Sequence, residues 1–268
     1  MGSGIGDLLP LCTGTGAKDL SATSSSAIYS SAMNSEALAI VYEDAQVLVV
    51  NKPPGVATTP TSADTPCLQR MAQAYLAPTH GSEPCFLATC GRLDLPVTGL
   101  VVLAKTRSAA AHLARQFRNR SIVKIYHALV SGRICAESGS LCNWLRGAGS
   151  HVKVRVVQAE SQDAREARLD YRVLKRFSRA TLVEIHLLTG RKHQIRVQLS
   201  HAGNPIWGDY KYGSRIAFPQ GIGLLAKELR ILHPRSERPL CCSVPTPAHW
   251  PTDIEGLCLG DRTWLKRQ

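Results

Sequence analysis

The chain has 268 residues, which is enough for one large or two modest domains. Its 32 Lys and Arg residues outnumber 20 Asp and Glu residues, which gives a net charge of +12 and a sequence pI near 9.5. This balance attracts polyanions such as nucleic acid, although it also fits a basic protein of another kind, and the 6% aromatic content argues against an RNA reader built on many stacking platforms.

Residues 1–36 are low in charge and rich in Ser, Gly, Ala and Thr. Such a segment buries too little apolar area to offset the entropy of ordering, so we expect a flexible N-terminal arm. Import into an organelle stays an alternative. However, transit peptides are rich in Arg and poor in acids, whereas this arm has no Arg and carries Asp7, Asp19 and Glu36.

Local patterns predict the elements of the first half. Apolar β-type runs at residues 40–42 and 47–50 flank a polar turn and predict a hairpin. Residues 66–76 and 106–119 have helical spacing, and residues 100–104 predict a buried strand between them. We expect the apolar faces of the two helices to consist of Leu68, Ala72 and Tyr75 in the first and Ala110, Leu113, Ala114 and Phe117 in the second.

The second half predicts more strands and one short helix. Residues 126–130 form a strand, and residues 152–156 alternate with two cations on one face, which is either an RNA-facing edge or a solvated one. Residues 169–173 and 182–187 predict a hairpin, and residues 193–201 predict a helix. Strand pairs with inserted helices, rather than regular βαβ repeats, predict an α+β fold with a mainly antiparallel sheet and flanking helices.

The nine cysteines form no Cys-x-x-Cys pair, and their number is odd. We therefore expect neither a disulfide framework nor a zinc knuckle, and reduced thiols indicate an intracellular, cytoplasmic protein that is not secreted. No apolar run approaches the roughly 20 residues of a membrane span, so we expect no membrane partner.

The most informative segment is residues 91–100, with the sequence Gly-Arg-Leu-Asp-Leu-Pro-Val-Thr-Gly-Leu. It places Arg92 and Asp94 at the mouth of the buried strand. Charges there lose solvation and need partners or a function. An Asp that caps a turn beside a surface Arg is the alternative, and the spacing alone does not decide between them.

Three further segments change this balance: residues 51–55 (Asn-Lys-Pro-Pro-Gly), 124–130 (Lys-Ile-Tyr-His-Ala-Leu-Val) and 189–196 (Thr-Gly-Arg-Lys-His-Gln-Ile-Arg), the last followed by residues 203–209. Together with Arg92-Leu93-Asp94 and Thr98-Gly99-Leu100, they resemble the ordered motifs of the RluA family of pseudouridine synthases. The resemblance covers residues 40 to about 245.

The resemblance implies a pseudouridine synthase catalytic domain at residues 37–250, with a central active-site cleft and a tail at residues 251–268. It implies an isomerase that converts specific uridines of ribosomal or transfer RNA to pseudouridine. No cofactor or metal is expected, and we expect a monomer without an obligate protein partner.

The resemblance also assigns residues. Asp94 is the catalytic carboxylate at the ribose. The resemblance leaves open whether Asp94 adds to C1′ or acts through a glycal. Tyr126 offers a flat face for uracil and a hydroxyl for late proton transfer. Arg196 matches the cation that pairs with the aspartate, with Arg191 as the alternative in the same motif.

Substrate binding is assigned to three cations. Arg92 is the candidate to fill the space left by a flipped nucleotide, since guanidinium stacks and also bonds phosphate, although it could be only a salt-bridge partner. Lys124 and Arg191 are expected to bind the RNA as well. His193 lacks partners at metal-ligand spacing and is expected to be a hydrogen-bonded structural residue.

Two positions depart from the family pattern: Gly91 and Leu225 stand where many members have His. Neither is the nucleophile, so we expect effects on loop rigidity, packing or RNA contact. The alternatives to the enzyme are a catalytically inactive RNA-binding protein on the same scaffold and an unrelated basic protein with chance matches. Retention of the catalytic set and the order of the motifs argue against both.

Overall fold

The computed structural model of the protein describes residues 38–62, 65–80, 86–147 and 153–250. The arm expected at residues 1–36 and the tail expected at residues 251–268 lie outside these ranges. Within the described ranges, no helix is long and apolar enough to cross a membrane.

The described strands form one mixed sheet of eleven strands, in the order β1-β2-β4-β10-β5-β9-β8-β6-β7, with β3 on β4 and β11 on β10. All pairs are antiparallel except β10 with β4. The strands are β1 (Ile40–Glu43), β2 (Val47–Lys52), β3 (Ala88–Thr89), β4 (Thr98–Ala104), β5 (Val123–Ser131), β6 (Ser138–Arg146), β7 (Arg155–Val157), β8 (Arg165–Arg176), β9 (Ala180–Leu187), β10 (Leu224–Leu232) and β11 (Pro239–Ser243). This architecture confirms the predicted α+β class.

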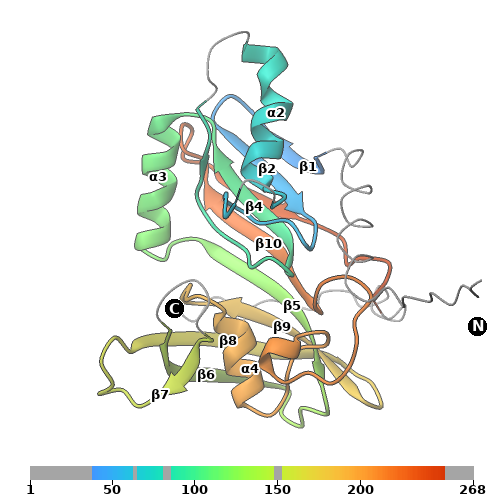
Figure 1. Ribbon diagram of the computed structural model, residues 1–268. Coiled ribbons are helices and arrows are strands. Elements are labelled where there is room, and N and C mark those ends of the chain that lie inside the picture. Colours follow the sequence, from blue (N-terminus) through green and yellow to red (C-terminus); the bar gives the residue numbers. More distant parts are fainter. Residues whose placement is uncertain (1–37, 63–64, 81–85, 148–152, 251–268) are drawn as a thin grey trace, which may run out of the picture. The chain divides into compact units, whose positions relative to one another are not determined.

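The described residues include three α-helices, which lie beside the two halves of this sheet (Figure 1). They are α2 (Leu68–His80), α3 (Arg107–Arg118) and α4 (Gln194–His201), and a short 3₁₀ helix, η1, spans Tyr210–Tyr212. Helices α2 and α3 accompany β1, β2, β4 and β10, whereas α4 accompanies β6, β8 and β9 (Figure 1). Strands β10 and β5 join the two halves.

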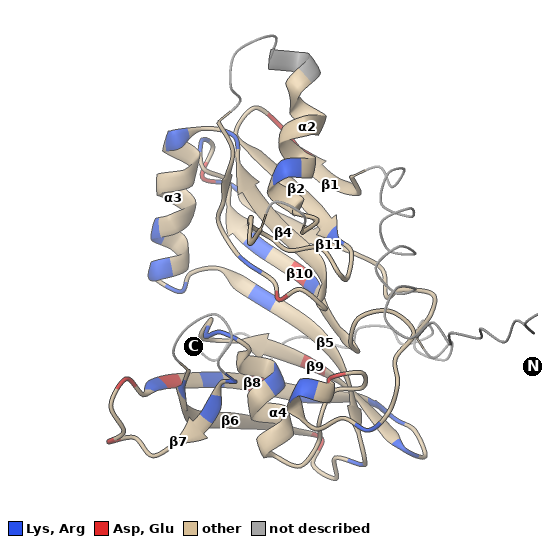
Figure 2. Ribbon diagram, viewed as in Figure 1, with Lys and Arg blue, Asp and Glu red and all other residues tan. Residues whose placement is uncertain are grey.

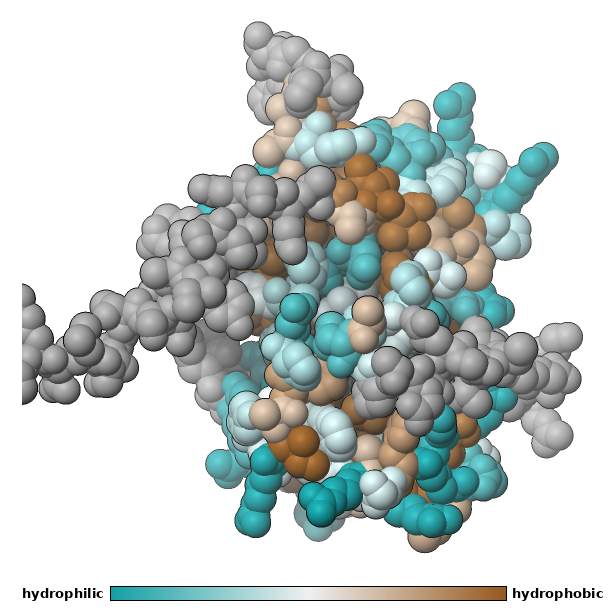
Figure 3. Space-filling view, turned by 90° about the vertical axis from the view of Figure 1, so that its right-hand side faces the viewer, coloured by the Kyte–Doolittle hydropathy of each residue, from teal (hydrophilic) through white to brown (hydrophobic). Residues whose placement is uncertain are grey.

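Each half has its own buried hydrophobic cluster, which supplies most of the driving force for folding. One cluster joins β2, β4 and β10 to α3, with Leu113 and Leu225 fully buried in it. The other joins β5, β8 and β9 to α4, with Ile185 and Leu199 at its centre. On the face shown in Figure 3, the hydrophobic residues that remain visible form separate groups among hydrophilic ones.

The predicted hairpins, the strand at residues 100–104 and the three helices are confirmed, but the helix faces were partly wrong. Tyr75 is 45% exposed, and Leu76 instead completes the buried face of α2 with Leu68 and Ala72. In α3 the buried residues are Ala109, Leu113 and Gln116. The face of α3 that packs on the sheet therefore lies about one position N-terminal to the predicted apolar face. Burial of the polar Gln116 is tolerated because its side chain hydrogen-bonds the backbone of Leu232.

Strand β10 was not predicted, although it is central. Its sequence, Leu-Leu-Ala-Lys-Glu-Leu-Arg-Ile-Leu, consists mainly of strong helix formers. Pairing with β4, β5 and β11 overrides this local preference. The close approach of β4 requires Gly99, whose φ is +122°, because a Cβ there would lie 2.4 Å from the carbonyl oxygen of Ala226.

Candidate active site

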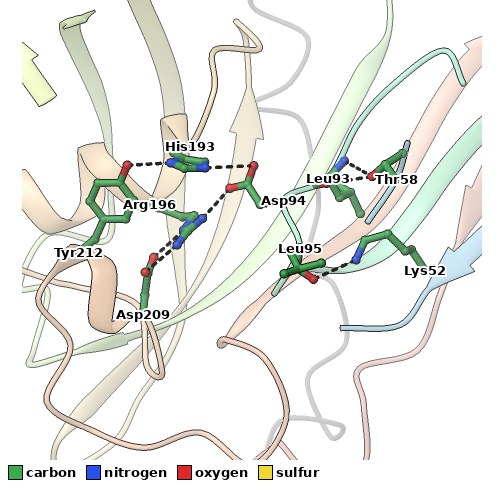
Figure 4. Close-up of polar contacts among 9 residues, drawn as sticks. All are labelled: Lys52, Thr58, Leu93, Asp94, Leu95, His193, Arg196, Asp209 and Tyr212. Atoms are coloured by element: carbon green, nitrogen blue, oxygen red, sulfur yellow. Dashed lines mark hydrogen bonds and ion pairs between the residues drawn. The ribbon is translucent and has the colours of Figure 1, made fainter. Parts of the chain in front are cut away.

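The loop that carries Asp94 connects β3 to β4 and is held by backbone contacts. The Thr58 hydroxyl donates to the Leu93 carbonyl at 2.9 Å and accepts from the Leu93 amide at 3.1 Å. The Leu95 carbonyl accepts from the Gly55 amide at 2.9 Å and from the Lys52 ammonium at 3.3 Å. Figure 4 shows Asp94 between this anchored segment and a second group of side chains.

The carboxylate of Asp94 pairs with Arg196. The Nη1 atom of Arg196 donates to Oδ2 of Asp94 at 2.9 Å (Figure 4). The Asp94 side chain remains 25% exposed. Arg191, the alternative partner from the sequence, does not reach Asp94. Its Nε donates to the Glu166 carbonyl at 2.9 Å instead.

Asp209 fixes the other side of the Arg196 guanidinium. Nε and Nη2 of Arg196 donate to its two carboxylate oxygens at 2.7 and 2.8 Å. Burial would lower the pKa of Arg196, but the hydrogen bonds and charges of Asp209 and Asp94 raise it above its ordinary value. Arg196 is therefore a permanent cation that presents one N–H edge to Asp94.

Asp209 was not predicted as a site residue, although it ends one of the motif segments. It is 1% exposed. A buried aspartate signals a cationic partner, but the sequence does not tell which of the many cations that partner is.

His193 lies beside this network and makes a hydrogen bond, as expected from the sequence. Its Nδ1 shares a hydrogen bond of 2.8 Å with the Tyr212 hydroxyl, and its Nε2 lies 3.8 Å from Oδ1 of Asp94. Burial lowers the pKa of His193, the charge of Asp94 opposes this, and the charge of Arg196 adds to it. The guanidinium of Arg196 also lies over the Tyr212 ring, 5.0 Å from its centre, so the ring restricts the guanidinium from a third side.

Strand β5 brings Tyr126 and Lys124 into the same cleft, which has a volume of about 1010 Å³ and is also lined by Asp94 and Arg196. The two side chains are two residues apart and so lie on one face of the strand. Burial raises the pKa of Tyr126, and the nearby charge of Asp94 raises it further, so the phenol is protonated near neutral pH. Burial lowers the pKa of Lys124 to about 8.

Arg92 and Arg191 line the same cleft, and Arg92 is exposed to solvent. The five predicted residues Arg92, Lys124, Tyr126, Arg191 and Arg196 therefore border one space together with Asp94. Within the described ranges, no group of three or more His, Cys, Asp or Glu side chains could hold a metal ion.

Lys52 is the second residue that sequence reasoning missed, although its motif was noticed. It is fully buried, and its ammonium donates to the carbonyls of Pro53, Val56 and Leu95 at 2.8, 2.9 and 3.3 Å. Burial lowers the pKa of Lys52 to about 7, against the opposing effect of the Asp94 charge. Three carbonyl acceptors need three N–H donors, which only the protonated form supplies.

The two departures from the family pattern have local explanations. A Cβ on Gly91 would lie 3.1 Å from Cζ of Phe117, so the Phe117 ring occupies the space that a larger residue would need. Leu225 belongs to β10, where it pairs with β4, and its side chain is fully buried in the hydrophobic core, so its role is packing.

The sequence pattern described as RNA pseudouridylate synthase matches residues 46–201. "Ribosomal large subunit pseudouridine synthase C" of Vibrio cholerae is 34% identical over 78% of this chain and 66% of its own length. "Ribosomal large subunit pseudouridine synthase D" of Pseudomonas aeruginosa is 38% identical over 68% of this chain and 55% of its own length. The chain thus spans slightly less than two thirds of the first relative and just over half of the second.

Among solved structures, human RNA Pseudouridylate Synthase Domain Containing 1 is similar to this chain with a TM-score of 0.66 and 26% identity. The similarity covers 85% of this chain and 93% of that chain. It extends the family likeness from the sequence to the arrangement of the sheet and helices.

Proposed function

The chain belongs to the RNA pseudouridylate synthase family, and we propose that it is an isomerase that converts specific uridines of RNA to pseudouridine. The observation that carries the proposal is the 2.9 Å contact of Asp94 with an Arg196 that the buried Asp209 holds in place, at the wall of a cleft large enough for a nucleotide. We assign this activity to a catalytic domain at residues 37–250.

The reaction breaks the bond between N1 of uracil and C1′ of ribose, turns the base and joins C5 to C1′. The proton on C5 leaves, and N1 gains one, so the product is an isomer of the substrate. Asp94 is the carboxylate that acts on the ribose. Arg196 orients it, because its Nη1 donates to Oδ2 of Asp94 at 2.9 Å from a guanidinium that Asp209 holds in place.

Tyr126 is proposed to contact the uracil. Its raised pKa means that the hydroxyl donates a hydrogen bond near neutral pH, and the ring offers a flat surface for the detached base. A proton that leaves C5 late in the reaction can pass to the Tyr126 oxygen as the hydroxyl gives its own proton to N1 of the reattached base, so Tyr126 ends the reaction protonated as it began.

The substrate must present its uridine outside the base stack. Arg92 is exposed at the cleft beside Asp94, so we assign it to the space that the flipped nucleotide leaves. Lys124 and Arg191 bind the RNA within the cleft. The names of the two bacterial relatives favour ribosomal RNA of the large subunit as the substrate, with transfer RNA as the second possibility.

We further propose that the protein works inside the cell, in the cytoplasm, as a monomer without an obligate protein partner. Support for the compartment comes from thiol chemistry: the six cysteines in the described ranges are all free.

The test is tritium release from ribosomal and transfer RNA labelled at C5 of uridine. The wild-type protein is expected to release tritium and to form pseudouridine, whereas Asp94→Asn is expected to do neither. A wild-type protein that binds these RNAs but releases no tritium would instead be the RNA-binding alternative on the same scaffold.

A further inference from the structure

Four cations from separate elements gather at one end of the cleft. Lys124 and Arg191 line the cleft, Arg120 follows the C-terminal end of α3, and Arg165 is the first residue of β8. Figure 2 shows Lys and Arg residues at this end of α3, on β5 and at the start of β8.

Contacts between side chains and backbone connect these elements. A Cβ on Gly190 would lie 3.5 Å from the Lys124 ammonium, so Lys124 reaches the segment that carries Arg191. Arg191 in turn donates its Nε to the carbonyl of Glu166, the residue after Arg165. The cluster therefore bridges both halves of the sheet across the cleft.

The positive charges of the cluster are poorly compensated by the protein. None of the four forms an ion pair with a carboxylate of the described ranges. Burial is the largest cause of the lowered pKa of Lys124, and the positive charge of Arg120 is the second. After burial, the charges of Arg120 and Arg165 lower the pKa of Arg191, and only the charge of Glu166 opposes them.

Donor groups of the cluster are also unused. Among the described residues, nothing accepts a hydrogen bond from the Lys124 ammonium, and Arg191 uses only its Nε, which leaves both Nη groups available. Arg120 and Arg165 are exposed. Like charges held together without acceptors destabilise the free protein, and an anion with several oxygen atoms would remove this cost.

We propose that Arg120, Lys124, Arg165 and Arg191 form a subsite that binds successive phosphates of the RNA strand next to the target uridine. The inference rests on the proposed function, because it places this strand relative to Asp94. Lys124 and Arg191 hold a phosphate near the catalytic residues, and Arg120 and Arg165 hold the strand as it leaves this end of the cleft.

The test compares the wild-type protein with the double variant Arg120→Gln/Arg165→Gln, which leaves every residue of the catalytic network in place. Gln retains a Cβ, so the left-handed backbone at residue 120, with φ of 57°, is equally strained in the variant. The matched control is Arg179→Gln, which removes an exposed cation from the turn between β8 and β9, at the other end of the strand that Arg165 begins.

Binding of a short fluorescein-labelled single-stranded RNA that contains one uridine is measured by anisotropy from about 50 to 200 mM salt. Each phosphate contact with single-stranded RNA contributes roughly 0.7 to the slope of log Kd against log salt concentration. The slope is expected to fall by about 1.4 in the double variant, with weaker binding at low salt. Arg179→Gln is expected to keep the wild-type slope.

Thermal melting separates loss of contact from loss of folding, since removing two like charges is expected to leave the melting temperature unchanged or higher. A double variant with the slope and affinity of Arg179→Gln would overturn the subsite, while tritium release by the wild-type protein would leave the proposed enzyme intact. Conversely, absence of tritium release together with the reduced slope would remove the enzymatic function and retain the phosphate site.

Discussion

Asp209→Asn is expected to disable the site from a buried position that does not face the cleft. The carboxylate of Asp209 accepts two charge-assisted hydrogen bonds from Arg196, and both side chains are almost fully buried. Asn keeps the shape and one oxygen acceptor, but its amide N–H groups then face an N–H group of the guanidinium. Arg196 is left with Asp94 as its only anionic partner.

Removing one partner of a buried ion pair costs about 3–5 kcal/mol. Since Nη1 of Arg196 retains Asp94 at 2.9 Å, we expect a cost near the lower end, about 3 kcal/mol, which corresponds to a fall in melting temperature of roughly 6–12 °C. The value of kcat should fall at least about tenfold, because Arg196 is free to shift away from the geometry that orients Asp94.

The assays are thermal denaturation and single-turnover pseudouridine formation below the melting temperature of the variant. Asp163→Asn is the matched control. It removes the same charge from an exposed residue with φ of 60°, a conformation that Asn adopts readily. If Asp209→Asn has the melting temperature and the single-turnover rate of the wild-type protein, the assignment of Asp209 as the residue that positions Arg196 is wrong.

Three further predictions address the chemistry, the loop and the RNA. Asp94→Asn should lower turnover by several orders of magnitude, with RNA affinity and melting temperature little changed, and substantial activity of the purified variant would remove Asp94 from the mechanism. The pKa of Lys52 is lowered to about 7 in the folded state from about 10.4 in an unfolded chain, so the folded state releases its proton first, and stability should rise between about pH 7 and pH 10. Activity should fall over the same range, because a neutral amine has too few N–H groups for three carbonyls. Denaturation and turnover, each measured against pH for the wild-type protein and for Lys52→Met, test both trends. Arg92→Ala should reduce single-turnover rates strongly on a structured stem-loop and less on an unstructured RNA, and equal losses on the two would leave Arg92 as a charge partner only.

The sequence by itself determined the local elements and the residues that can carry the chemistry. The hairpin at residues 40–50 and the pair β8 and β9 follow from short polar turns between apolar runs, whose signals lie within a few residues of each other. The position of Asp94 in a turn before a buried strand could likewise be predicted, because Pro96, Gly99 and the apolar run are adjacent to it.

The tertiary structure alone decided how these residues combine. Arg191 and Arg196 are equivalent cations in one motif, but Arg196 lies in the first turn of α4, and the packing of this helix brings its guanidinium to Asp94. Arg191 precedes the helix and is directed to the backbone of β8.

Long-range contacts decided the rest. The roles of Asp209 and Lys52 depend on partners elsewhere in the chain: Arg196 lies 102 residues beyond Asp94 and 13 before Asp209, and Leu95 lies 43 beyond Lys52. Strand β10 has the composition of a helix and becomes a strand because β4, β5 and β11 satisfy its backbone on both sides. Neighbours in sequence set local conformation, whereas hydrogen-bond partners of buried charges and of a central strand are set only when distant segments pack together.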